Sequence, residues 1–175
     1  MTVGCLIGIS MVPVPAAAHD HRPPRATLAS AADQQRGRPL HSAWLARADS
    51  RFCDFMTRRA LPSFPRALPH ATGEEVRILL PKAAAPLELS VEAWRAVGSD
   101  GRPEGARETV PAALVPRLEG TQVAAWEIRF VPPPVTPHLY LAVEAYWADE
   151  ESCSRPPDLG SQSASWAFHL AGTGR

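Results

Sequence analysis

The stretch Leu139–Trp147 (LYLAVEAYW) places a large apolar or small apolar side chain at every odd position. The even positions hold Tyr140, Ala142, Glu144 and Tyr146. Successive side chains of an extended strand point to opposite faces, so this pattern predicts a strand with one apolar face. Alternation of this kind is typical of antiparallel sheets that bury one face and leave the other in water.

The same period of two recurs along the C-terminal half of the chain. It is found in residues 75–81, 87–94, 121–131 and 163–170, and no helical pattern lies between them. Residues 109–118 are interrupted by two prolines, which favours an edge strand. Five or six such strands predict an all-β, immunoglobulin-like antiparallel β-sandwich over residues 63–175. Its core is expected to contain Trp126, Trp147, Trp166 and Phe168.

A different spacing precedes this region. Apolar side chains recur at helical intervals between Ser42 and Arg59, namely Trp44, Leu45, Ala48, Phe52, Phe55 and Met56. Ser42 suits a helix N-cap, and Pro62 would prevent continuation. The pattern predicts one short N-terminal helix within residues 42–62, packed on the sandwich domain.

Residues 19–41 contain few large apolar side chains and much Pro, Arg, Gln and Ala. Such a segment buries too little surface to offset the entropy of ordering it. Composition therefore predicts a disordered tail or linker between the leader and the helix.

The N-terminus has features of an export signal. An apolar run, Val3–Val14, is too short to span a bilayer as a helix and is followed by Ala16-Ala17-Ala18, a small-x-small cleavage pattern. No Lys or Arg precedes the run, unlike in an ordinary leader. Residues 1–18 are therefore expected to be a signal peptide. The mature protein would be secreted or periplasmic, in the cell envelope, with no integral membrane span.

Loss of the leader would remove Cys5 and leave Cys53 and Cys153. An even pair of cysteines in an exported protein predicts a disulfide bond. The alternative is two free buried thiols, because spacing alone does not bring two Cα atoms together.

Cleavage after Ala18 would expose His19-Asp20-His21 with a free α-amine. The amine, backbone amides and the imidazoles of His19 and His21 would suit tetragonal nitrogen ligation of copper. His138 and His169 are possible further ligands. The alternative is a solvated tail without a cofactor.

Four side chains fall on the faces opposite the expected core: Trp94, Tyr140, Glu144 and Tyr146. Arg129 has the same orientation in its own strand. Aromatic rings beside charged groups on a flat sheet can stack on a glycan or anchor an envelope protein. The alternative is that the N-terminal helix or tail covers this face.

Composition and motifs exclude several classes of function. Eighteen basic residues balance eighteen acidic ones, so no nucleic-acid footprint is expected. Metalloprotease, P-loop, dinucleotide-binding and nucleophile-elbow motifs are absent. The sequence favours an exported, non-enzymatic module with a binding or structural role. A copper-binding protein using His19 and His21, and a hydrolase with an unidentified acidic site, remain the alternatives.

Overall fold

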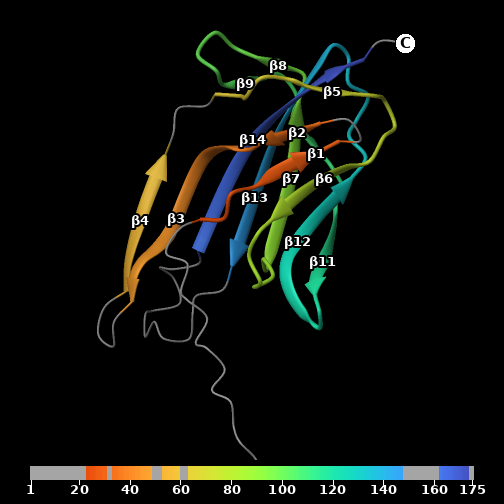
Figure 1. Cartoon of the computed structure of the whole chain (residues 1–175). Helices are drawn as coiled ribbons and strands as arrows, with labels where there is room; N and C mark the ends of the chain where they lie inside the picture. Colours follow the sequence, from red (N-terminus) through yellow and green to blue (C-terminus); the bar gives the residue numbers. More distant parts are fainter. Residues whose placement is uncertain (1–22, 31–32, 49–52, 60–62, 148–161, 174–175) are drawn as a thin grey trace, which may run out of the picture.

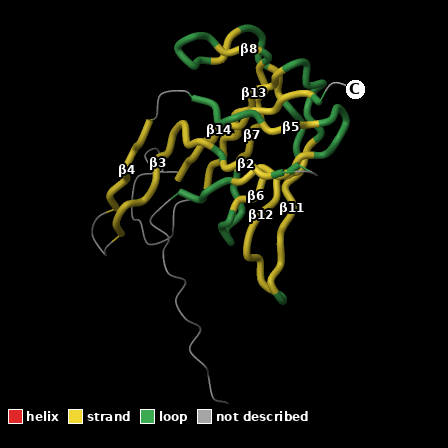
Figure 2. The backbone as a smooth tube through the Cα atoms, turned by 45° about the horizontal axis from the view of Figure 1, so that its top comes forward, coloured by secondary structure: helices red, strands yellow, loops and turns green. Residues whose placement is uncertain are grey.

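The computed structural model describes residues 23–30, 33–48, 53–59, 63–147 and 162–173. These residues form strands and loops, and none of them is helical (Figure 2). Within these ranges no helix has the length and apolar character needed to cross a lipid bilayer. The expected signal peptide, His19, His21 and Cys153 lie outside the described residues, so the predicted disulfide and copper site stay predictions.

The strands form two antiparallel sheets packed as a sandwich (Figure 1). The five-stranded sheet has the order β11 (Ala113–Glu119), β12 (Gln122–Phe130), β6 (Val76–Leu80), β1 (Thr27–Ala29) and β2 (Gln34–Arg36). The seven-stranded sheet has the order β10 (Glu108–Thr109), β7 (Glu88–Trp94), β13 (His138–Trp147), β14 (Gln162–Gly172), β3 (Arg38–Ala48) and β4 (Cys53–Arg59). Its remaining strand, β5 (Leu68–His70), runs parallel to the end of β14, while β8 (Ala96–Val97) and β9 (Pro103–Glu104) form a separate small hairpin.

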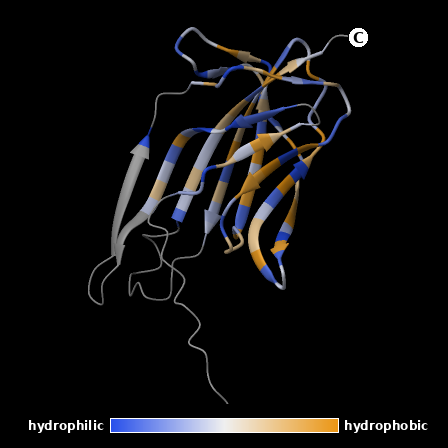
Figure 3. Ribbon diagram, viewed as in Figure 1, coloured by the Kyte–Doolittle hydropathy of each residue, from blue (hydrophilic) through white to orange (hydrophobic). Residues whose placement is uncertain are grey.

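The alternation seen in the sequence becomes the inner face of both sheets. In β13 every odd residue is buried and every even residue is partly exposed, as the sequence predicts. Orange and blue bands alternate along β12 in Figure 3 for the same reason. The core combines apolar residues of the five-stranded sheet with larger ones of the seven-stranded sheet: Leu28, Ile78, Leu80, Ile128, Leu139, Leu141, Val143, Trp147, Trp166, Phe168 and Leu170. The all-β prediction is therefore confirmed, and Trp126 packs against this core while only partly buried.

The predicted helix over residues 42–62 is wrong. β3 and β4 occupy this region as a hairpin, with Ala43 opposite Thr57 and Trp44 opposite Met56. Ser42 and Trp44 are buried, whereas His41 and Ala43, which alternate with them, are only partly buried. This is the period of two of a strand. The helical spacing fitted the local sequence equally well. Without β3, however, one edge of β14 would have unpaired backbone groups, and β3 pairs with them as a strand.

The predicted disordered linker over residues 19–41 is also wrong for the part that the structure describes. Strands β1, β2 and the start of β3 lie in it, and Leu28 is completely buried between β2 and β6. The short strands β1 and β2 add one buried side chain each, Leu28 and Gln35, to an interior supplied by other strands. A segment poor in apolar residues is thus ordered by pairing with distant strands.

Gln35 connects the two sheets. Leu28 pairs with Gln35 across β1 and β2, so the Gln35 side chain points inward, like that of Leu28. Its Oε1 accepts a hydrogen bond from the backbone N–H of His169 at 2.9 Å, and its Nε2 donates to the His169 carbonyl at 3.1 Å and to the Arg66 carbonyl. The carboxamide therefore pairs with the backbone of β14 as a neighbouring strand would. It does so between Ala167, which pairs with β3, and Leu170, which pairs with β5.

Gly37 makes the crossing from β2 to β3 possible. The residue is buried, and a Cβ atom at this position would lie 2.6 Å from Cζ of Phe168. Only glycine allows the backbone to pass this close to the Phe168 ring.

Replacing Gln35 should lower the free energy of unfolding more than replacing an exposed glutamine does. In Gln35→Ala the partly buried N–H and C=O of His169 lose their partners, so we expect the free energy of unfolding to fall by about 2–4 kcal/mol. Urea unfolding measures this, with Gln34→Ala, an exposed neighbour, as the control expected to stay within about 0.5 kcal/mol. Equal losses in the two variants would contradict the role assigned to Gln35.

His70 should make stability depend on pH. Its side chain is 2 % exposed, and neither ring nitrogen has a hydrogen-bond partner among the described residues. Burial lowers the pKa of His70 from its ordinary 6.5, partly opposed by Glu74. Below pH 6.5 the unfolded chain therefore binds a proton that the folded chain resists, and stability is lost as pH falls toward the folded pKa.

The measurement is urea unfolding at pH 7.5, 6.5 and 5.5. We expect stability to fall across this series, and both His70→Leu and His70→Gln to reduce the slope, because neither replacement titrates. An unchanged slope in both variants would show that other groups carry the pH dependence.

Candidate functional site

The four side chains expected on a binding face lie on the outer face of the seven-stranded sheet. Tyr140 stands opposite Trp94 in the register of β13 and β7, and Glu144 and Tyr146 follow on the same face of β13. Arg129 lies elsewhere, on the outer face of the five-stranded sheet, where its Nη2 contacts Glu127 Oε2 at 2.7 Å. The structure thus gathers four of the five residues.

Glu144 and Tyr146 form one polar unit on this face. The Tyr146 hydroxyl donates a hydrogen bond to Glu144 Oε1 at 2.8 Å. This bond, with burial and the charge of Glu144, raises the pKa of Tyr146 to about 12. The Glu144 carboxylate is therefore engaged by its neighbour.

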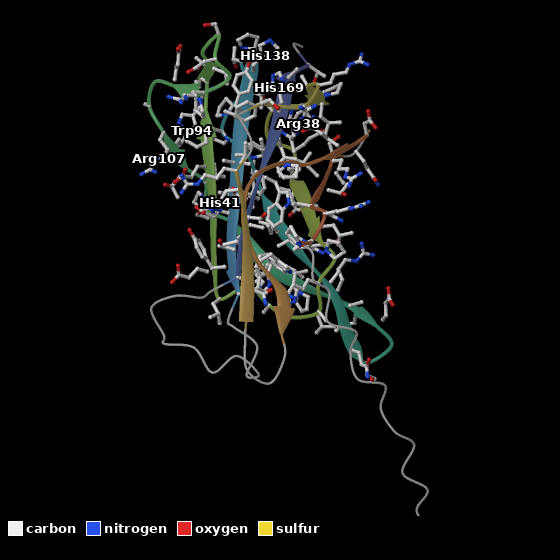
Figure 4. All side chains as sticks on the ribbon, turned by 90° about the vertical axis from the view of Figure 1, so that its left-hand side faces the viewer. Arg38, His41, Trp94, Arg107, His138 and His169 are labelled. Carbon is white, nitrogen blue, oxygen red and sulfur yellow. The ribbon has the colours of Figure 1, made fainter. Side chains whose placement is uncertain are left out.

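Trp94 lines a hollow at the other end of the face. The hollow has a volume of about 310 Å³ and is bounded by Leu40, His41, Arg59, Phe64, Trp94, Pro103 and Ala142. Its lining residues are mainly apolar, and the two with ionisable side chains are His41 and Arg59. Figure 4 shows Trp94 and His41 on strands β7 and β3 of the same sheet. We call this the Trp94 hollow.

A β-bulge shapes one wall of the hollow. Ser165 of β14 pairs with His41 and Trp166 pairs with Pro39, so Leu40 has no partner in the register. An extra residue of this kind re-aims the side chains around it. Adjacent residues Leu40 and His41 consequently both line the hollow, which strict alternation would forbid.

Small side chains form the part of the sheet below these walls. Ala142 lies on the floor of the hollow, and its partner across β13 and β14 is Ala167. Ser165 lies between Glu144 and His41 and is only 8 % exposed. The sequence suggested a wetted outer face for β14, but its small residues are shielded between larger neighbours.

A row of rings holds the Phe64 wall in place. Tyr140 stacks on His169 with ring centroids 4.4 Å apart and an angle of 18°, and Phe64 meets Tyr140 edge-on at 4.9 Å. Tyr140 is therefore engaged in packing and is less available to a ligand than Trp94.

His138 and His169 lie together beside this row (Figure 4). His169 Nδ1 is 3.2 Å from the Pro65 carbonyl, which only accepts, so Nδ1 carries the proton. His169 Nε2 is then free to accept from His138 Nδ1, also at 3.2 Å. Burial lowers the pKa of His169, opposed in part by the Pro65 bond. The hydrogen bond to Pro65 links His169 to the residue next to Phe64.

Metal-ligating side chains do not gather within the described ranges. No three of the His, Cys, Asp and Glu side chains that the structure describes come close enough to hold an ion. His138 and His169 form only a pair. Cys53 lies in β4, but its expected partner, Cys153, is outside the described residues.

Sequence reasoning missed six residues of the hollow: Leu40, His41, Arg59, Phe64, Pro103 and Ala142. Residues 40 and 41 had been assigned to a linker and 59 to a helix, so their contribution to a sheet was hidden. The alternate small residues Ser163, Ser165 and Ala167 were the available signal, because small outward side chains permit a depression in a sheet.

The site combines a partly buried indole, apolar walls and a cation at one side. Such an arrangement is suited to binding a ring and fixing one polar substituent on it. Comparison of the chain with protein-family models, with curated proteins and with solved structures gave no match in any of the three.

Proposed function

We propose that this protein is an exported, non-enzymatic β-sandwich module that binds a glycan of the cell envelope or its surroundings. The Trp94 hollow is the observation that carries the proposal. Its ligand would seat one sugar ring against the Trp94 indole, with Leu40 and Pro103 completing the apolar walls.

The size and lining of the hollow support a small ring rather than a folded partner. About 310 Å³ lies at the lower end of the range of small-molecule sites. Sugar rings expose C–H groups on their faces and hydroxyl groups at their edges. An aromatic wall such as Trp94 suits the C–H groups of the ring face. Polar side chains beside it, here His41 and Arg59, suit the hydroxyl groups at the ring edge.

The surrounding face supports a chain of sugars over an isolated ring. Beyond the hollow the partly exposed polar residues Ser90, Glu144 and Tyr146 continue along β7 and β13. Hydroxyl and carboxylate groups at these positions would meet the next units of a glycan.

The cellular setting of the proposal comes from the sequence. Val3–Val14 and Ala16-Ala17-Ala18 support export, and Cys53 with Cys153 would supply a disulfide in an oxidising compartment. We include an immunoglobulin-like arrangement of the sandwich in the proposal, supported by two antiparallel sheets around one aromatic core.

Retention on immobilised polysaccharides tests the function. We expect the secreted protein to be retarded by at least one envelope or extracellular polysaccharide in affinity electrophoresis. Trp94→Ala should weaken this binding at least about tenfold, because it removes the stacking surface. The intact glycan should be recovered without new reducing ends.

Leu118→Ala is the matched control, since Leu118 is a large exposed apolar residue of β11 on the other sheet. It should bind as the unaltered protein does. Equal binding by Trp94→Ala, absence of retention on every polysaccharide, or release of reducing ends would each overturn the proposal.

A further inference from the structure

The charges around the Trp94 hollow are unbalanced in a way that indicates the ligand. Three acidic side chains of the neighbouring strands β7 and β13 lie on this face, namely Glu88, Glu92 and Glu144. Glu88 stands opposite Tyr146, at the end of β7 away from Trp94, and the other two are engaged. Glu92 Oε1 lies 3.1 Å from Arg107 Nη1, and Glu144 accepts the Tyr146 hydroxyl at 2.8 Å. Neither carboxylate faces the hollow without a partner.

Arg59 differs from these residues. Its side chain is exposed, and the residue lines the hollow. The Arg59 guanidinium has no ion pair or hydrogen bond with any residue that the structure describes. Arg38, an arginine of the neighbouring strand β3, uses Nη1 to donate to Ser63 Oγ at 3.0 Å. Arg59 is therefore the cation of this site that is left for a ligand.

Other acids near the hollow are directed away from it. Glu104 follows Pro103 in β9, and Pro103 lines the hollow. Successive side chains of a strand point to opposite sides, so Glu104 points away. The ligand thus meets an apolar enclosure with an arginine fork and the His41 imidazole at its side, and no described carboxylate.

A guanidinium group is shaped to hold a carboxylate. Its donors lie in one plane and can form two parallel hydrogen bonds to the two oxygens of a carboxylate. Apolar walls strengthen such a bond by excluding water from one side. A neutral sugar would leave the Arg59 charge partly desolvated without compensation.

We infer that the sugar unit seated in the Trp94 hollow is acidic: a pyranose ring stacked on Trp94, with its carboxylate bound by Arg59 and assisted by His41. This inference rests on the proposed function and names its ligand class. Polymers of hexuronic acids are glycans of this chemistry.

The test compares each acidic sugar with its own uncharged form. Trisaccharides of glucuronate, galacturonate and mannuronate are titrated calorimetrically into the full secreted protein, each as the free acid and as the methyl ester. We expect at least one free acid to bind at least about tenfold more tightly than its ester, and the preference to shrink as salt is raised.

Arg59→Gln should abolish this preference by weakening the free acid at least about tenfold more than the ester, and Arg59→Lys should restore part of it because the charge returns without the fork. Arg77→Gln is the control: Arg77 is an exposed arginine of the five-stranded sheet paired with Glu75 at 2.9 Å. It should keep the full preference. Thermal unfolding of each variant establishes that it is folded.

The outcomes separate this inference from the proposed function. If acid and ester bind equally and Trp94→Ala weakens both, the glycan-binding function stands and the acidic ligand is overturned. Binding to neutral polysaccharides alone has the same meaning. A sulfated trisaccharide that binds as tightly as the carboxylate would also overturn the inference, because Arg59 would then select charge without shape. Absence of binding to every glycan overturns both.

Discussion

The hydrogen bonds between the Gln35 carboxamide and the backbone of His169 are the constraint on which the rest of this sandwich depends. β14 pairs with β13 along its whole length, but on its other side β3 covers only the first half and β5 only the end. At His169 that side would be a buried strand edge without a partner. A side chain from the opposite sheet fills the gap, and so the two layers are joined by polar bonds as well as by apolar packing.

This arrangement also positions the outer face. Fixing the backbone of His169 fixes its ring, on which Tyr140 stacks, and Tyr140 in turn packs against Phe64. The opposite wall of the hollow comes from Trp94 in β7, and the β3 bulge adds Leu40 and His41. The binding surface that we propose is therefore built from four separate parts of the chain. Its shape follows from how the sheet is assembled, and a local motif does not encode it.

The extent to which the sequence predicted this structure follows from the same facts. β13 and β6 were predictable because each contains its own alternation, with every second residue buried. β1 and β2 were not, since each has three residues and buries a single side chain, and Leu28 is ordered by β6 from elsewhere in the chain. Residues 42–59 fitted two periodicities, and the choice was made by the edge of β14, more than a hundred residues away. Trp94 was found as an outward aromatic residue, but Arg59 was hidden by the wrong assignment of its segment.

The location of β14 in the chain has a consequence for the order in which the molecule is completed. β14 lies between β13 and β3 in the sheet, yet it is the last of the described strands along the sequence, and Gln35 meets a residue 134 positions later. The hairpin β3–β4 consequently has no docking site until β14 has been made, and contacts this distant in sequence form slowly. Until β14 is inserted, the larger sheet is therefore divided into two separate parts, β7 with β13 and β3 with β4, and the lower-numbered strands must wait for the latest one to unite them.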